Sequence, residues 1–177
     1  MASELQVQTI SGPPTGANAN KILIPSGQTL DITDWDPPSG TVVNYQHSDY
    51  LPTGDINFNS TSWTEINSAL RITYTPISTS NKLILRYRST SCLWATSSYL
   101  HYTIYEVGGS NLFGARYIMR TYCSTNTEIP FDSSITIDAW SGSKTISPYA
   151  KVSTGNAYLN WAGGDNIMQF SIMEIAA

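Results

Sequence analysis

Apolar and polar residues alternate along two neighbouring runs, residues 70–75 and 83–88, which are separated by the polar segment 76–81. Side chains in a strand point to opposite faces at every second residue, so each run can bury one side and expose the other. Pro76 has no N–H group for a ladder and must end the first strand. The pattern predicts a hairpin whose inward residues are Leu70, Ile72, Tyr74, Leu83, Leu85 and Tyr87.

The same alternation recurs in short runs after residue 41. These runs cover residues 41–45, 99–105, 113–122, 135–139, 147–153, 157–161 and 167–175. Turn-forming Gly, Pro, Asn and Ser residues separate them at intervals of roughly 8–15 residues, which is typical of a sandwich or barrel. We therefore predict an all-β fold over residues 41–177, an antiparallel two-sheet jelly roll or β-sandwich without helices.

Residues 1–40 differ from the rest because proline and glycine interrupt them near both ends. Two short strands about a Pro-Ser-Gly turn are predicted between these breaks, and they carry Ile22, Ile24, Leu30 and Ile32. A pair of strands this small cannot bury its own apolar residues. The segment is therefore predicted to be a short extended arm whose four aliphatic residues need a partner surface, which is the following domain, another copy of the chain or a different protein.

The last run is apolar on both of its faces. Its apolar residues are Ile167, Met168, Phe170, Ile172, Met173 and Ile175. A strand of this kind needs cover on both sides, and symmetric copies of the chain are the simplest source of the second cover. We predict that these six residues form a subunit interface. Glu174 should then lie at the strand end and reach solvent or an arginine of a neighbouring copy, since an unpaired buried carboxylate is costly.

Charge excludes several classes of partner. Charged residues make up 12% of the chain, about half of the ~25% usual in soluble domains, and the net charge is -4. Phosphate backbones need clustered Lys and Arg, so no nucleic-acid partner is expected. Glu4 stands where a signal peptide would carry a base, and no apolar run is long enough for a membrane span. The composition predicts a soluble protein assembled in a reducing cytoplasm, with Cys92 and Cys123 as inert thiols or, alternatively, one disulfide.

No constellation in the chain indicates catalysis. His47 and His101 are the only histidines, and no serine lies in a nucleophile elbow. Asp31, Asp34 and Asp36 form an acidic cluster, but their spacing does not match a calcium loop, and a solvated turn is the favoured interpretation. We therefore assign no catalytic residue, metal site or cofactor.

Three tryptophans stand beside predicted turns, namely Trp94, Trp140 and Trp161. A large ring at such a place either caps the end of a core or serves as an anchor for a sugar or a protein. They are the candidate receptor-binding residues, with core capping as the alternative.

Four parts of the sequence stand out together: the opening MASELQVQTI, the arm ANKILIPSGQTLDI, TSWTEI followed by RITYTPISTSNKLIL, and the ending FSIMEIAA. These segments resemble small structural proteins of marine tailed bacteriophages, particularly those that infect cyanobacteria. The resemblance covers nearly the whole chain. It implies a head similar to the jelly rolls of tumour necrosis factor and the complement globular domains, which are usually trimers, attached to the particle by the N-terminal segment.

The resemblance implies a non-enzymatic virion protein assembled in the host cytoplasm. The expected form is a homotrimeric spike or fibre head that contacts other virion proteins through its arm and presents loops to a host-surface glycan or protein. The alternatives are a capsid decoration protein, a spike that depolymerises polysaccharide, and a cellular jelly-roll lectin.

Overall fold

The computed structural model describes residues 37–94, 98–123, 129–159 and 166–177. The chain divides into residues 1–36 and residues 37–177. The arm-docking residues Ile22, Ile24, Leu30 and Ile32 lie outside the described residues, so the attachment arm remains a prediction.

The described part of the second unit contains eleven strands and one short 3₁₀ turn. The strands are β1 (Val42–Tyr50), β2 (Ile56–Phe58), β3 (Thr64–Glu65), β4 (Ile72–Tyr74), β5 (Lys82–Trp94), β6 (Ser98–Glu106), β7 (Met119–Cys123), β8 (Ile129–Asp138), β9 (Lys144–Val152), β10 (Asn156–Leu159) and β11 (Met168–Ile175). The 3₁₀ turn η1 (Ser68–Leu70) is capped at its N-terminus by Asn67, whose side chain accepts a hydrogen bond from the Ala69 N–H.

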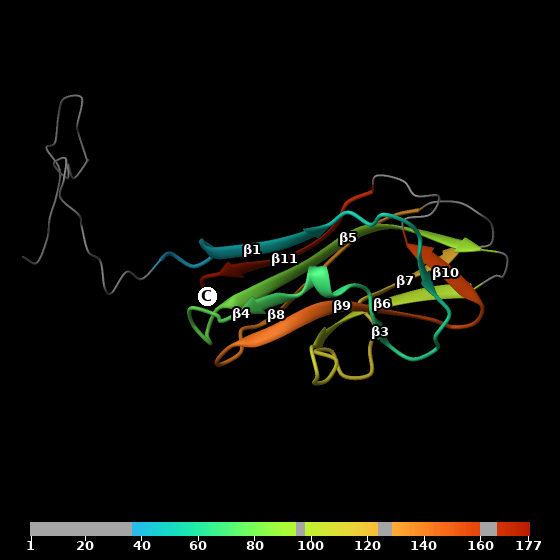
Figure 1. Cartoon of the computed structure of the whole chain (residues 1–177). Coiled ribbons are helices and arrows are strands. Elements are labelled where there is room, and N and C mark those ends of the chain that lie inside the picture. The colour runs from blue at the N-terminus through green and yellow to red at the C-terminus, as the bar shows by residue number, and fades with distance from the viewer. Residues whose placement is uncertain (1–36, 95–97, 124–128, 160–165) are drawn as a thin grey trace, which may run out of the picture. The chain divides into compact units, whose positions relative to one another are not determined.

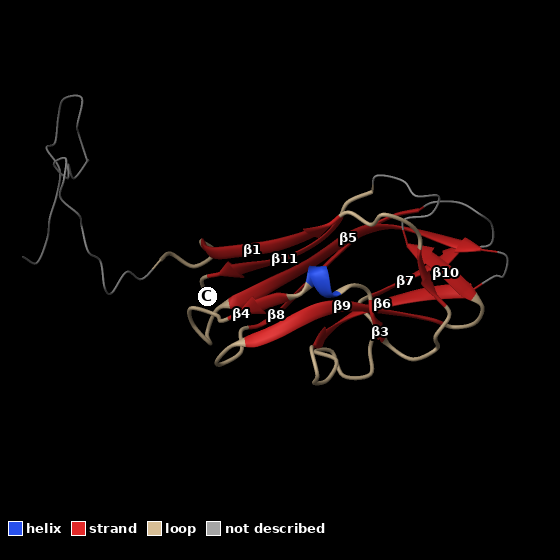
Figure 2. Cartoon of the chain, in the orientation of Figure 1, coloured by secondary structure: helices blue, strands red, loops and turns tan. Residues whose placement is uncertain are grey.

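All strand pairs are antiparallel and form two sheets (Figures 1 and 2). In the first sheet, here called sheet A, β1 pairs with β11, β11 with β5, and β5 with β8. Beyond the end of β11, β10 pairs with the same edge of β5, and β2 pairs with β10. In the second, sheet B, β3 and β4 pair with β9, β9 with β6, and β6 with β7. The chain passes repeatedly from one sheet to the other, and its first described strand pairs with its last. This confirms the predicted antiparallel jelly roll.

The predicted alternation defines the core. Leu70, Ile72, Tyr74, Leu83, Leu85 and Tyr87 are all buried, whereas Arg71, Thr73, Arg86 and Arg88 are exposed. The opposing face comes from sheet B, where Leu100, Tyr102 and Ile104 on β6 alternate inward and are at most 2% exposed. Burying one such aliphatic side chain contributes about 1.5–3 kcal/mol, so these matched faces supply most of the force that holds the sheets together.

The predicted hairpin between residues 70 and 88 is wrong in its pairing. β4 pairs with β9 in sheet B, and β5 pairs with β11, β8 and β10 in sheet A. The segment 76–81 is therefore a crossing between the sheets. Both runs face the core from opposite sides, which produces the same alternation that a hairpin would.

The strand predicted over residues 113–122 is also shorter than expected, because only Met119–Cys123 is extended. The residues between Asn111 and β7 begin with a turn that the Asn111 side chain holds together. Its Oδ1 accepts from the Phe113 N–H at 2.9 Å and from the Thr103 hydroxyl at 2.8 Å, while its Nδ2 donates to the Arg116 carbonyl at 2.8 Å. Gly114 completes this turn with φ of 66°, a left-handed conformation that other residues rarely adopt.

Glu174 on β11 is completely buried and holds the crossing segment in place. Its carboxylate accepts hydrogen bonds from the Tyr74 hydroxyl at 2.7 Å and from Asn81 Nδ2 at 2.7 Å. It also accepts from the backbone N–H groups of Ile77 at 2.9 Å and Ser78 at 3.2 Å. The prediction that Glu174 reaches solvent or a neighbouring arginine is therefore wrong. The carboxylate is balanced by neutral donors, which makes its burial tolerable.

These contacts also set the acid response of the fold. Burial alone would raise the pKa of Glu174, but the hydrogen bonds from Tyr74, Asn81 and the two backbone N–H groups outweigh it and lower the pKa below its usual value. A carboxyl whose pKa is lower in the folded chain than in the unfolded chain stabilises the fold above its unfolded pKa of about 4.3. This stabilisation is lost as the pH falls through the folded pKa.

We expect Glu174→Gln to reduce the free energy of unfolding at pH 7 by about 1–3 kcal/mol, because it replaces one acceptor oxygen by a donor among buried donors. The variant should also lose less stability than the wild type when the pH falls below about 4.3. Urea denaturation at pH 7 and pH 3.5 measures both effects. Glu106→Gln is the matched control, since Glu106 pairs only with the part-exposed Lys144 and should change stability by under about 1 kcal/mol. Equal effects of the two substitutions would contradict the assigned role.

Candidate functional site

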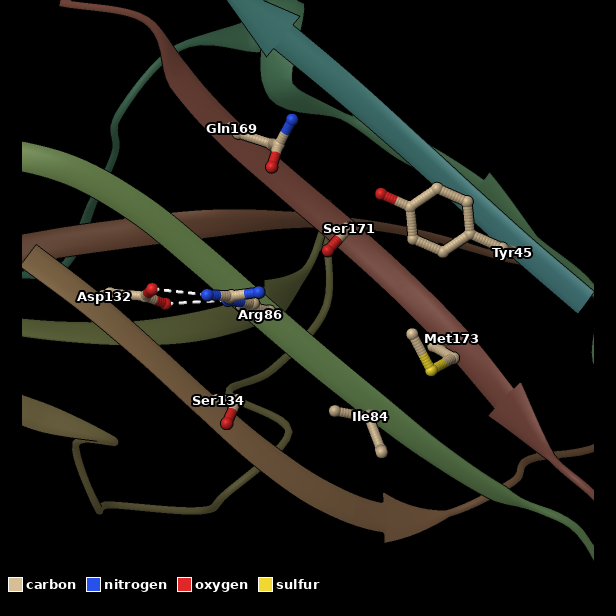
Figure 3. A pocket seen from close by; sticks show the side chains of 8 residues that line it. All are labelled: Tyr45, Ile84, Arg86, Asp132, Ser134, Gln169, Ser171 and Met173. Carbon is tan, nitrogen blue, oxygen red and sulfur yellow. Dashed lines mark hydrogen bonds and ion pairs between the residues drawn. The ribbon is translucent and has the colours of Figure 1, made fainter. Parts of the chain in front are cut away.

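The outer face of sheet A is hollowed into an open trough of about 600 Å³ (Figure 3). Strands β1, β11, β5 and β8 lie side by side here, so every second residue of each strand faces the trough. The lining residues are Tyr45, Ile84, Arg86, Asp132, Ser134, Gln169, Ser171 and Met173. Small serines on the middle and outer strands leave the hollow between the larger side chains.

One half of the trough is polar and internally neutralised. Arg86 binds Asp132 through two hydrogen bonds, one of them from Nε to Oδ1 at 2.8 Å, and Arg88 Nε lies 3.5 Å from Asp132 Oδ2. The hydrogen bonds from Arg86, together with the charges of Arg86 and Arg88, lower the pKa of Asp132. Gln169 in turn donates to Asp49 at 2.9 Å. Exposed pairs of this kind contribute little to stability, but they satisfy the charges of this half.

The other half is apolar. Tyr45, Met173 and Ile84 lie directly opposite one another across β1, β11 and β5. Val42 and Tyr45 on the edge strand β1 are 51% and 49% exposed, and Ile175 beside them is half-buried. Five apolar side chains thus gather at the end of the sheet where the chain finishes. The face can bind another surface through this end, but its paired charges suit no acid–base chemistry.

Five of the six predicted interface residues lie on β11, where they divide between the two faces of the strand, and Ile167 directly precedes it. Met168, Phe170 and Ile172 are at most 1% exposed and pack into the core of the chain itself, so they have no surface left for a partner. Met173 and Ile175 face outward and are half-buried, and Ile167 is 59% exposed. Of the six residues, only Ile167, Met173 and Ile175 therefore have surface that a second copy of the chain could cover.

The three predicted anchor tryptophans are placed differently. Trp161 lies outside the described residues. Trp94 is the last residue of β5, and the structure describes its backbone but not its side chain. Trp140 follows β8 and packs against the core, with its ring 6.3 Å from that of Tyr74 in an edge-to-face arrangement and the Lys144 amine 6.0 Å from its centre. Its position is that of a core cap; a role in receptor binding remains a prediction.

Other candidate chemistry is sparse in the described part of the chain. Among those residues no group of three or more His, Cys, Asp or Glu is arranged to hold a metal ion. No helix among them is long and apolar enough to cross a membrane. Asp31, Asp34 and Asp36 lie outside the description, as do the side chains of Cys92 and Cys123. His47 lies on the outer face of β1, with its Nε2 3.8 Å from Asp49.

Sequence inspection overlooked the strand-borne aromatic residues on the outer face of sheet B. Tyr99, His101 and Tyr105 lie on the outward side of β6, with the buried Thr103 between the last two. Their period of two is visible in the sequence. What the sequence does not reveal is which residues of β7 and β9 lie beside them, since that depends on the register of non-local strand pairs.

No family model matches the chain, and no curated protein matches it. Among solved structures, the chain is similar to that of a T13 particle of infectious bursal disease virus, with a TM-score of 0.45, 13% identity and coverage of 86% of this chain and 41% of that one. It is also similar to a VP2 subviral particle of the same virus, with a TM-score of 0.41, 10% identity and coverage of 93% of this chain and 46% of that one. Latent PorU of Porphyromonas gingivalis matches with a TM-score of 0.37, 6% identity and coverage of 89% of this chain and 15% of that one. The chain spans less than half the length of each. Matches at this level indicate nothing about what this chain binds.

We expect Trp140→Ala to destabilise the fold by about 3 kcal/mol, because removal of a ring that caps the core leaves a cavity over Tyr74. Trp140→Phe should cost clearly less, since it keeps an aromatic contact there. Thermal unfolding followed by circular dichroism compares the two variants with the wild type. If Trp140→Ala keeps full stability, the ring does not cap the core and its role as an exposed anchor is favoured.

Proposed function

We propose that this chain is a non-enzymatic structural protein of a bacteriophage particle. In this proposal three copies form a spike or fibre head, residues 1–40 attach the head to other virion proteins, and loops of the head meet a host-surface glycan or protein. The similarity of several segments to small structural proteins of marine phages supports the assignment to a virion, and the jelly-roll fold agrees with it.

The observation that carries the assembly part of the proposal is the apolar end of the sheet A face. Val42, Tyr45, Ile84, Met173 and Ile175 expose apolar surface in one place, beside a trough whose charges are already paired. Apolar surface gathered on one face of a soluble domain marks an interaction site. A symmetric copy can cover this end without leaving a charge unpaired.

The first test concerns the oligomeric state. We expect the purified protein to have the mass of three 19.4 kDa chains in light scattering at micromolar concentration. Met173→Glu should give a folded monomer, because it places a charge in the middle of the proposed contact. Gln46→Glu adds the same charge at an exposed position on the other side of β1 and should remain trimeric. A wild-type monomer would rule the trimer out.

The second test concerns attachment. Four aliphatic side chains, each worth about 1.5–3 kcal/mol when buried, are enough to hold a short arm on a partner. We therefore expect a chain without residues 1–33 to keep the unfolding temperature of the head but to be absent from purified particles. Immunoblotting of gradient-purified phage measures its incorporation. Normal incorporation of the truncated chain would refute the role of the arm.

A further inference from the structure

Aromatic side chains in two groups, here together called the aromatic band, lie on the outer face of sheet B, where the strands β7, β6 and β9 pair side by side (Figure 1). The rings of Tyr99 and Tyr122 lie 4.9 Å apart, and those of His101 and Tyr117 lie 4.7 Å apart. Further along, Tyr105 stacks on Tyr149 at 4.5 Å and contacts Trp63 at 6.3 Å. Tyr122 and Tyr117 are 49% and 42% exposed, so the band presents ring surface and hydroxyl groups to solvent.

Two cations are built into this band. Arg120 and Lys151 lie directly on either side of His101 in the strand register, on β7 and β9. The Arg120 guanidinium carbon stands 4.7 Å from the centre of the Tyr99 ring, and the Lys151 amine stands 4.7 Å from that of Trp63. Ring contacts of this kind hold a cation in place and leave its other donors free.

These cations differ from the other basic residues of the described chain, most of which are neutralised. Arg71, Lys82, Arg86, Arg88 and Lys144 each pair with a carboxylate. Within the described residues Arg120 and Lys151 have no ion pair, and the same holds for Arg116, which precedes Tyr117 in the chain. The nearby carboxylates are occupied as well, since Glu65 binds Arg71 and Glu106 binds Lys144. In a chain of net charge -4, this face therefore keeps two positive charges without a carboxylate partner.

We propose that the outer face of sheet B binds an anionic polysaccharide, with Arg120 and Lys151 contacting its acidic groups and the Tyr rings contacting its sugar faces. This inference rests on the proposed function and specifies the ligand that such a head would meet on a host surface. Two strand spacings, about 10 Å, separate the backbone positions of Arg120 and Lys151, and charges carried on separate strands suit an extended oligosaccharide with repeated acidic groups.

A single-stranded nucleic acid also combines anionic groups with flat surfaces, but it fits this face less well. Nucleic-acid grooves stack successive bases on rings and track the backbone with several cations. Here the Tyr99 and His101 rings are tilted by 51° and the His101 and Tyr117 rings by 66° against one another, and among the described residues two cations, Arg120 and Lys151, contact rings of the band. Sugars need no parallel stack, because their C–H faces and hydroxyls can contact rings and Tyr hydroxyls at varied angles.

His101 makes binding sensitive to pH. Burial, then the charges of Lys151 on β9 and Arg120 on β7, lower its pKa. Tyr99 on its own strand and Tyr117 contact its ring, and no carboxylate among the described residues faces it. A bound anion opposes both cations and favours the protonated imidazole. Affinity should therefore rise as the pH falls through the region below 6.5.

The test measures binding of the full-length protein by calorimetry with three probes: an alginate oligosaccharide with carboxylates, a dextran sulfate oligosaccharide, and neutral dextran. We expect binding to one or both charged probes, weakened by salt, and none to neutral dextran. Arg120→Gln and Lys151→Gln should each reduce affinity about tenfold, the loss expected for one charge-assisted hydrogen bond. Lys82→Gln removes the same charge from an exposed position of sheet A outside the trough and should change affinity less than twofold. Comparison of the two charged probes distinguishes carboxylate from sulfate recognition.

Three results would overturn the inference: no binding to either charged probe, an equal loss in Lys82→Gln, or tighter binding of a single-stranded oligothymidylate than of either glycan. Particle incorporation separates this inference from the proposed function. A chain that joins particles but binds no glycan refutes only the ligand assignment. A chain that binds glycan but is absent from particles refutes the virion role and leaves this site standing.

Discussion

The buried carboxylate of Glu174 is the contact on which the sandwich closure depends. Its donors come from Tyr74 at the end of β4 and from the segment 76–81 that crosses to β5, while Glu174 itself lies on β11. One side chain therefore joins sheet B, sheet A and the connection between them. An apolar residue would fill the space but would leave two backbone N–H groups and an amide without acceptors, which is a costly arrangement inside a protein.

The inward faces of the strands could be predicted from the sequence, whereas the pairing of the strands could not. Alternation depends only on burial of one side, and it identified Ile72, Leu83, Leu85 and their neighbours correctly. The same alternation is expected whether residues 76–81 turn back within one sheet or cross to the other. Glu174, which fixes the crossing, lies about a hundred residues away from Tyr74 in the chain. No local sequence pattern indicates such a contact. The hairpin prediction was therefore wrong at residues 76–81, whose path is fixed by a side chain far away in the sequence.

A similar limit applies to the functional surfaces. Tryptophans beside turns drew attention because of their size, yet Trp140 packs on the core. The aromatic band of sheet B is built from tyrosines at ordinary outward positions, each unremarkable alone. It becomes a surface only because the register places Tyr122 beside Tyr99 and Arg120 and Lys151 beside His101. Likewise, β11 is apolar on both sides, but only the register with β1 and β5 shows that Met173 meets Tyr45 and Ile84.

The two outer faces of the sandwich differ in whether their basic side chains are paired with carboxylates. On sheet A, Asp138 of β8 pairs with Lys82, and Asp132 of β8 pairs with both Arg86 and Arg88, so each of these cations keeps a carboxylate partner when a protein surface covers the face. On sheet B, Arg120 and Lys151 rest on aromatic rings and keep their charge available. Burying that second face against an apolar partner would desolvate two cations without compensation, which costs several kcal/mol for each ion. The same chain can therefore use sheet A for assembly and keep sheet B open to a charged ligand, because the distribution of ion pairs makes the exchange of these roles unfavourable.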